Sequence, residues 1–176
     1  MTASWLSDPF IVRNLTYGIE DSLISTTGVL VGVASAGFSL PAILMTGGIL
    51  IFVEASSMAF GAFMADESFL ITAKTAYTIS QVLFYAGVMF VSYVVAGIIP
   101  MIPFVLKWKH AIPASVVLAM TALFLLALWI QKDVAKALLL TAIGTAIMFA
   151  SIAAGRYAGQ YAEPYARKFD KHGLKN

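Results

Sequence analysis

The segment 75–106, TAYTISQVLFYAGVMFVSYVVAGIIPMIPFVL, contains no Asp, Glu, Lys or Arg over its whole length. A membrane with a hydrocarbon core about 30 Å thick needs roughly 20 apolar helical residues per crossing, so this segment is long enough to span it. Three further stretches, 22–53, 111–131 and 137–155, lack charged residues in the same way. The pattern therefore predicts an integral membrane protein built from helices.

The composition of the whole chain supports the same class. Of its 176 residues, 60% are hydrophobic and 11% are charged, and the net charge is +2. Soluble domains carry roughly 25% charged residues because their surfaces face water. We therefore expect a surface that faces lipid, and a single transmembrane domain over residues 1–176 with no separate soluble domain.

Several function classes are disfavoured by the same sequence. The small net charge, with basic residues in loops and in the C-terminal tail, predicts no nucleic-acid partner. The absence of Cys excludes thiolate metal sites, disulfides and Cys nucleophiles. The sequence also lacks clustered His residues and a phosphate-binding loop, so we expect neither an enzyme nor a permanently bound cofactor.

Breaks between the apolar stretches predict the helix boundaries. Proline is favoured at the first position of a helix, so we start the second helix at Pro41. The expected fold is an all-α integral membrane protein with five transmembrane helices, at about 19–38, 41–65, 81–106, 111–131 and 137–158. Residues 1–18 are expected as an interfacial or cytoplasmic segment, with a frayed tail as the alternative. Residues 66–80 are expected as a short connection that extends a helix outside the membrane, and residues 159–176 as a tail in which a helix leaves the membrane.

Ionisable residues within a membrane are costly and persist mainly where they have a function or a partner. Glu20 and Asp21 open the first predicted crossing, and Glu54 lies in the middle of the second. Met58 follows Glu54 by one helical turn on the same face. For Asp21 the alternative is helix capping, for Glu54 a protonated structural carboxyl, and for Met58 simple packing.

Together these four residues predict a metal site. Carboxylate oxygens bind divalent cations, and a thioether tolerates Fe²⁺ and its softer neighbours better than Mg²⁺ or Ca²⁺. A carboxylate that releases a metal can take up a proton in its place. Glu20, Asp21, Glu54 and Met58 therefore predict a proton-coupled antiporter for a divalent first-row metal.

Small residues follow one stripe on each of the first two predicted helices. The first stripe contains Asp21, Ser25, Gly28, Gly32 and Ala36, and the second contains Ser57, Gly61 and Ala65. Because small side chains let helices approach closely, we expect the two stripes to face each other beside a polar path. Gly28 and Gly32 also favour a homodimer, and the alternative is that they pack helices within one subunit.

Three segments resemble the vacuolar iron transporter family in order and spacing across almost the whole chain: YGIEDSLISTTG (17–28), EASSMAFG (54–61) and GIIPMIPF (97–104). The resemblance implies five transmembrane helices and a homodimer with the metal path at the subunit interface. It also implies movement of cytosolic Fe²⁺, and often Mn²⁺, into a vacuole or out of the cytoplasm in exchange for protons. Asp21 matches the family's first-helix metal aspartate, Met58 its second-helix methionine, and Pro100 and Pro103 its third-helix prolines.

The chain departs from the family pattern in two places. The family's second-helix glutamate lies two turns before the methionine, where this chain has Leu50, so we expect Glu54 to replace that ligand at a different depth. Many members carry a long Glu-rich cytoplasmic metal-binding domain between helices two and three, and this short member lacks it. In the remaining connection, Asp66 and Glu67 are candidates for a funnel that admits cations, and a solvated helix end is the alternative.

The resulting hypothesis is proton-coupled transport of Fe²⁺ or Mn²⁺ out of the cytoplasm by a homodimer in contact with membrane lipid. The lysine and arginine count favours an extracytoplasmic N-terminus, whereas the resemblance implies a cytoplasmic one, which we adopt. The small size favours a prokaryotic cell membrane, with a vacuolar membrane as the alternative. Competing hypotheses are a passive channel or carrier for another small solute, and a structural membrane protein without transport.

Overall fold

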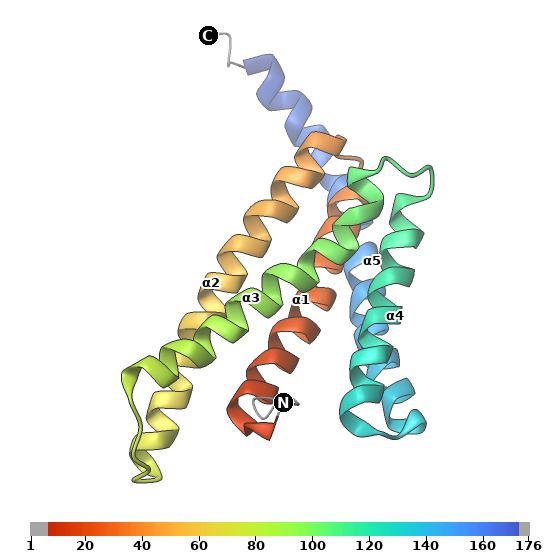
Figure 1. Ribbon diagram of the computed structural model, residues 1–176. Helices are drawn as coiled ribbons and strands as arrows, with labels where there is room; N and C mark the ends of the chain where they lie inside the picture. Colours follow the sequence, from red (N-terminus) through yellow and green to blue (C-terminus); the bar gives the residue numbers. More distant parts are fainter. Residues whose placement is uncertain (1–6, 173–176) are drawn as a thin grey trace.

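The computed structural model describes residues 7–172, with side chains described for residues 7–160, and that part of the chain is helical without strands. Five helices follow one another: α1 (Pro9–Ser35), α2 (Leu40–Thr72), α3 (Ile79–Val105), α4 (Ala111–Gln131) and α5 (Val134–His172). Figure 1 shows α2 and α3 as one hairpin and α4 and α5 as a second. The all-helical class predicted from the sequence is confirmed.

Local sequence signals fix the helix ends. Asp8 caps α1 by accepting a hydrogen bond from the Phe10 N–H at 2.8 Å, and α3 begins with a reciprocal capping box between Thr78 and Gln81. The ends of α2, α3 and α4 share a different device, a lysine in the left-handed backbone region: Lys74, Lys107 and Lys132. A left-handed residue stops a helix, and a cation there also complements the negative end of the helix dipole.

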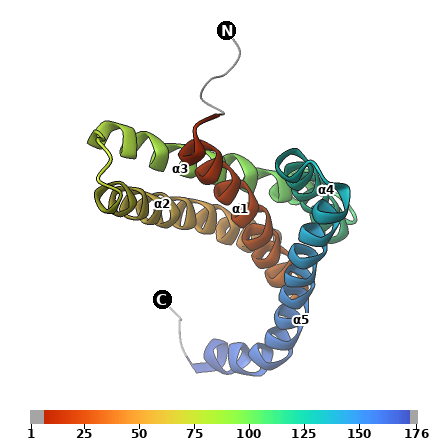
Figure 2. The same cartoon turned by 90° about the horizontal axis from the view of Figure 1, so that it is seen from below.

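Helix α1 is the centre of the fold. Within the described part of the chain it contacts all four other helices, whereas α2 contacts only α1 and α3 there. Figure 2 shows α1 between the two hairpins. Its buried face is rich in polar and small residues: Asn14, Gly18, Ser22, Thr26, Thr27, Gly28 and Gly32. The most polar face of the described chain therefore lies inside the bundle, away from the surface that would meet lipid.

Among the described residues, four helices are long and apolar enough to cross a membrane: α2, α3, α4 and the Val134–Gln160 part of α5, with mean hydropathies of 1.8 to 2.4. Large apolar side chains on these helices point outward, as Phe60 at 67% exposure and Leu139 at 61% illustrate. These properties are those of a multi-pass integral membrane protein. Helix α1, which carries Arg13, Glu20 and Asp21, is not among the four, so five crossings remain a prediction.

One expected boundary differs from the structure. Helix α1 begins at Pro9 rather than near residue 19, so residues 9–18 belong to it and not to a separate segment 1–18. Residues 1–6 of that segment lie outside the described part. The connection 66–80 and the tail 159–176 were expected to extend their helices, and α2 does continue to Thr72 and α5 to His172. Charged residues interrupt the apolar pattern at these places but do not interrupt the backbone hydrogen bonding of a helix.

Glycines on α1 pack against a matching set of small residues on α5. The facing residues are Gly28, Gly32 and Ala36 on one side and Ser151, Gly155 and Gly159 on the other. A Cβ atom on Gly28 would lie 2.8 Å from the Ser151 Oγ, and one on Gly155 would overlap the carbonyl of Gly32. The two helices therefore approach to backbone contact at this interface.

This packing corrects the expectation for the two small-residue stripes. Gly28 and Gly32 pack helices within one chain, which was the alternative to a role in dimerisation. Ser57, Gly61 and Ala65 of α2 are exposed, and a Cβ atom on Gly61 would meet nothing within 4 Å. The two stripes therefore do not face each other. Asp21 and Ser25 of the α1 stripe line a groove with α2, whereas Gly28 and Gly32 lie against α5.

We predict that Gly155→Ala lowers the free energy of unfolding by about 1–3 kcal/mol, because the new methyl group must push α5 away from the backbone of Gly32. Unfolding in detergent micelles, followed by circular dichroism, measures the change. Gly61→Ala is the matched control on α2 and should be neutral or slightly stabilising, since the position is open and alanine favours helix. Equal stability of the two variants would contradict the close approach of α1 and α5.

Candidate functional site

A groove with a volume of about 620 Å³ lies between α1, α2 and α5. All four residues predicted as metal ligands line it, and each is partly buried: Glu20, Asp21, Glu54 and Met58. Ser25 and Leu50 line the same groove. The structure thus brings together side chains from two helices that the sequence identified separately.

The short turn between α1 and α2 explains why the two carboxylates meet. Asp21 lies fourteen residues before Ser35, where α1 ends, and Glu54 lies fourteen residues after Leu40, where α2 begins. At 1.5 Å per residue, both are about 21 Å from the turn and therefore at the same level. Their charges are close enough to interact. One turn nearer to the connecting turn, Ser25 lies level with Leu50 in the same way.

Glu20 occupies a different place from its neighbour Asp21. Successive residues of a helix point about 100° apart, and Glu20 lines both the groove and a second cavity of about 240 Å³ between α1, α4 and α5. Across the side chains that the structure describes, no three His, Asp or Glu residues are close enough together to hold a metal ion. A single chain therefore offers two level carboxylates and a thioether, with Glu20 at the edge.

A hydroxyl pair behind the groove is a feature that the sequence interpretation missed. Tyr93 of α3 is completely buried, and its phenol oxygen lies 2.7 Å from the Ser25 Oγ. The Ser22 hydroxyl donates a hydrogen bond to the backbone oxygen of Tyr93 at 2.6 Å. Tyr93 is one of three tyrosines in the apolar run 75–106 and gives no signal of its own. Ser25 was already part of the polar stripe predicted on the first helix, one turn from Asp21, but its partner was not predicted.

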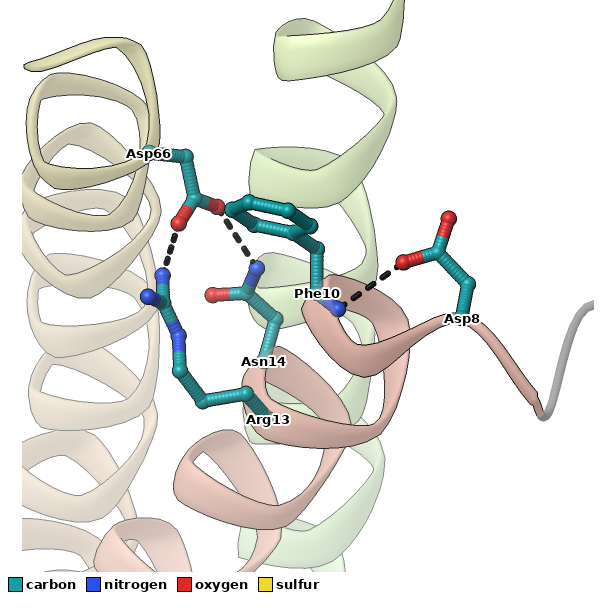
Figure 3. Close-up of polar contacts among 5 residues, drawn as sticks. All are labelled: Asp8, Phe10, Arg13, Asn14 and Asp66. Atoms are coloured by element: carbon teal, nitrogen blue, oxygen red, sulfur yellow. Dashed lines mark hydrogen bonds and ion pairs between the residues drawn. The ribbon is translucent and has the colours of Figure 1, made fainter. Parts of the chain in front are cut away.

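Asp66 lies elsewhere, near the C-terminal end of α2 and beside the first turns of α1 (Figure 3). Its side chain is completely buried, forms an ion pair with Arg13 and accepts a hydrogen bond from the Asn14 side chain at 2.8 Å. The Arg13 guanidinium also lies 5.7 Å from the centre of the Phe10 ring, a cation–π distance. Asp66 therefore joins the two helices and faces no water, which corrects the expectation that it forms part of a cation funnel.

Glu67, the second residue of the expected funnel, is partly buried beside Asp66. A role for Glu67 in admitting cations stays a prediction. With Asp66 already paired to Arg13, Glu67 would have to act without it.

We predict that Arg13→Ala lowers the free energy of unfolding by about 3–5 kcal/mol, because it leaves the Asp66 carboxylate buried without its cation. The double variant Arg13→Met with Asp66→Leu should recover most of this loss, since it removes both charges. Denaturant titration of the purified protein in detergent, followed by tryptophan fluorescence, compares the variants. The exposed loop variant Lys109→Ala serves as control, and an Arg13→Ala protein as stable as this control would contradict the assignment.

The chain matches no protein-family model, no curated protein and no solved structure. The resemblance to the vacuolar iron transporter family therefore rests on the three quoted segments and on the spacing of their residues, and it stays a prediction.

Proposed function

We propose that this protein carries a divalent transition-metal cation, Fe²⁺ or Mn²⁺, out of the cytoplasm in exchange for protons. The observation that supports the proposal most directly is the convergence of Asp21, Glu54 and Met58 on one groove of an apolar helical bundle. Ionisable side chains at such a place are expected to serve an ion or a proton.

Two level carboxylates supply the exchange chemistry. When both are ionised they repel each other, and either a cation between them or a proton on one of them relieves the repulsion. A divalent cation and protons therefore compete for the same oxygens. Protons that reach Asp21 and Glu54 from an acidic compartment would release the metal there, and their departure on the cytoplasmic side would restore the site.

Met58, one turn from Glu54, favours a transition metal as cargo. Met58 lies one turn from Glu54 and lines the groove with it, so its sulfur is available beside the carboxylate oxygens. Thioether sulfur binds Fe²⁺ and softer first-row metals, whereas Mg²⁺ and Ca²⁺ prefer oxygen ligands alone. Leu50, one turn to the other side, contributes no ligand.

The incomplete ligand set of one chain is the reason to propose a homodimer. Two copies with their grooves together would double the carboxylates and thioethers around one path, as the family resemblance implies. Helix α2 contacts only α1 and α3, so its remaining surface is free to meet a second copy. In this arrangement α1 crosses the membrane as a fifth helix, shielded by the other four, with the N-terminus in the cytoplasm.

We predict that liposomes containing the purified protein take up Fe²⁺ anaerobically, and that an inside-acid pH gradient accelerates uptake. Glu54→Gln and Asp21→Asn should each reduce the initial rate at least about tenfold, because each removes one charge from the pair that binds the cation. Met58→Leu keeps the side-chain volume and should weaken discrimination of Fe²⁺ against Mg²⁺ in competition assays. Asp133→Asn in the α4–α5 turn is the matched control, since asparagine caps a helix as aspartate does.

The same assay separates the competing functions. Uptake that is independent of the pH gradient would indicate a passive channel or a carrier of another kind. A folded protein that moves neither Fe²⁺ nor Mn²⁺ would overturn the transport proposal and leave a structural membrane protein.

A further inference from the structure

The proposed function does not yet use Ser25, which lines the groove, or Tyr93, which lies behind it. Ser25 lines the groove one turn from Asp21, and its Oγ lies 2.7 Å from the phenol oxygen of Tyr93. At this level α2 presents the apolar Leu50. Ser25 therefore brings a hydroxyl oxygen to the turn next to the two carboxylates on the side of Leu50.

Tyr93 is held in place by two of the three helices that form the groove, α1 and α2. Ser22 of α1 donates a hydrogen bond to its backbone oxygen, and its side chain belongs to a buried cluster with Ile51 and Ala55 of α2. Gly97, one turn further along α3, keeps this contact close: a Cβ atom there would lie 2.8 Å from both Ile51 and the Ser22 Oγ. Because the Tyr93 ring is held on two sides, its phenol group fixes the position of the Ser25 hydroxyl, to which it is hydrogen-bonded.

The hydroxyl chemistry leaves Ser25 able to bind a cation. A serine hydroxyl has one proton and two lone pairs. If Tyr93 donates, one lone pair of the Ser25 Oγ remains free, and if Ser25 donates, both remain free. A free lone pair on an oxygen that lines the groove is a ligand of the kind that divalent cations accept.

We propose that Ser25 contributes its hydroxyl oxygen to the cation site, and that Tyr93 is a positioning residue that holds this oxygen toward Asp21 and Glu54. The inference rests on the proposed function, because it names further residues of the same site. Tyr93 itself does not touch the cation; it acts through Ser25.

A double-mutant cycle with Mn²⁺ as the probe tests the inference. Mn²⁺ binding to the purified full-length protein is measured by electron paramagnetic resonance, and the KM for Mn²⁺ is measured in liposomes. Ser25→Ala and Tyr93→Phe should each weaken binding and raise KM about three- to tenfold, the value of one hydrogen bond or ligand oxygen, with the maximal rate unchanged. The double variant should bind no more weakly than Ser25→Ala alone, since Tyr93 acts through Ser25. Ser25→Thr keeps the hydroxyl and should bind as the wild type does.

Tyr85→Phe is the matched control. It removes another phenol of α3, one that donates a hydrogen bond to Asp8 at 2.9 Å outside the groove, and it should leave the KM for Mn²⁺ unchanged. Additive effects of Ser25→Ala and Tyr93→Phe, or an unchanged KM in both single variants of an active protein, would overturn this inference alone. A wild-type protein that neither binds nor transports Mn²⁺ would overturn the proposed function and this inference with it.

Discussion

The whole arrangement depends on keeping the polar face of α1 out of contact with lipid. Buried Asn14 and a series of hydroxyl and glycine positions make α1 a poor surface for hydrocarbon, and each unsatisfied polar group there would cost several kcal/mol. The four apolar helices that contact α1 cover this polar face, and their own outer surfaces remain free to face lipid. The chemistry of the protein is thereby concentrated on one helix and on the faces of α2 and α3 that contact it.

Two of the contacts of α1 differ in character. Where Gly28 and Gly32 meet α5, the helix backbones come close together. At the level of Asp21 and Glu54, a groove lies between α1, α2 and α5. Tyr93 of α3 lies behind this groove, where it contacts α1 by hydrogen bonds and α2 by packing. Small residues in one part of α1 and polar residues in another thus accompany close packing and a groove along a single helix.

Much of this could be predicted from the sequence, because charge-free stretches and helical spacing are local properties. The all-helical class and the grouping of Glu20, Asp21, Glu54 and Met58 followed from them, and the structure places these four residues in one groove. What could not be predicted depends on distant pairs. Arg13 and Asp66 are fifty-three residues apart, so nothing local in the sequence shows that they form an ion pair. A role for Tyr93 can be inferred only once the fold places α3 beside Ser25.

The Arg13–Asp66 ion pair also fixes the position of α2 relative to α1. This helix is attached to α1 at two places, the short turn before Leu40 and the buried pair at Asp66, and Glu54 lies between them, about 21 Å from the first and about 18 Å from the second. The middle of α2 is held separately, because Ile51 and Ala55 pack against the buried Tyr93 of α3. The distance between the carboxylates of Asp21 and Glu54 therefore depends on three fixed points along α2, two on α1 and one on α3.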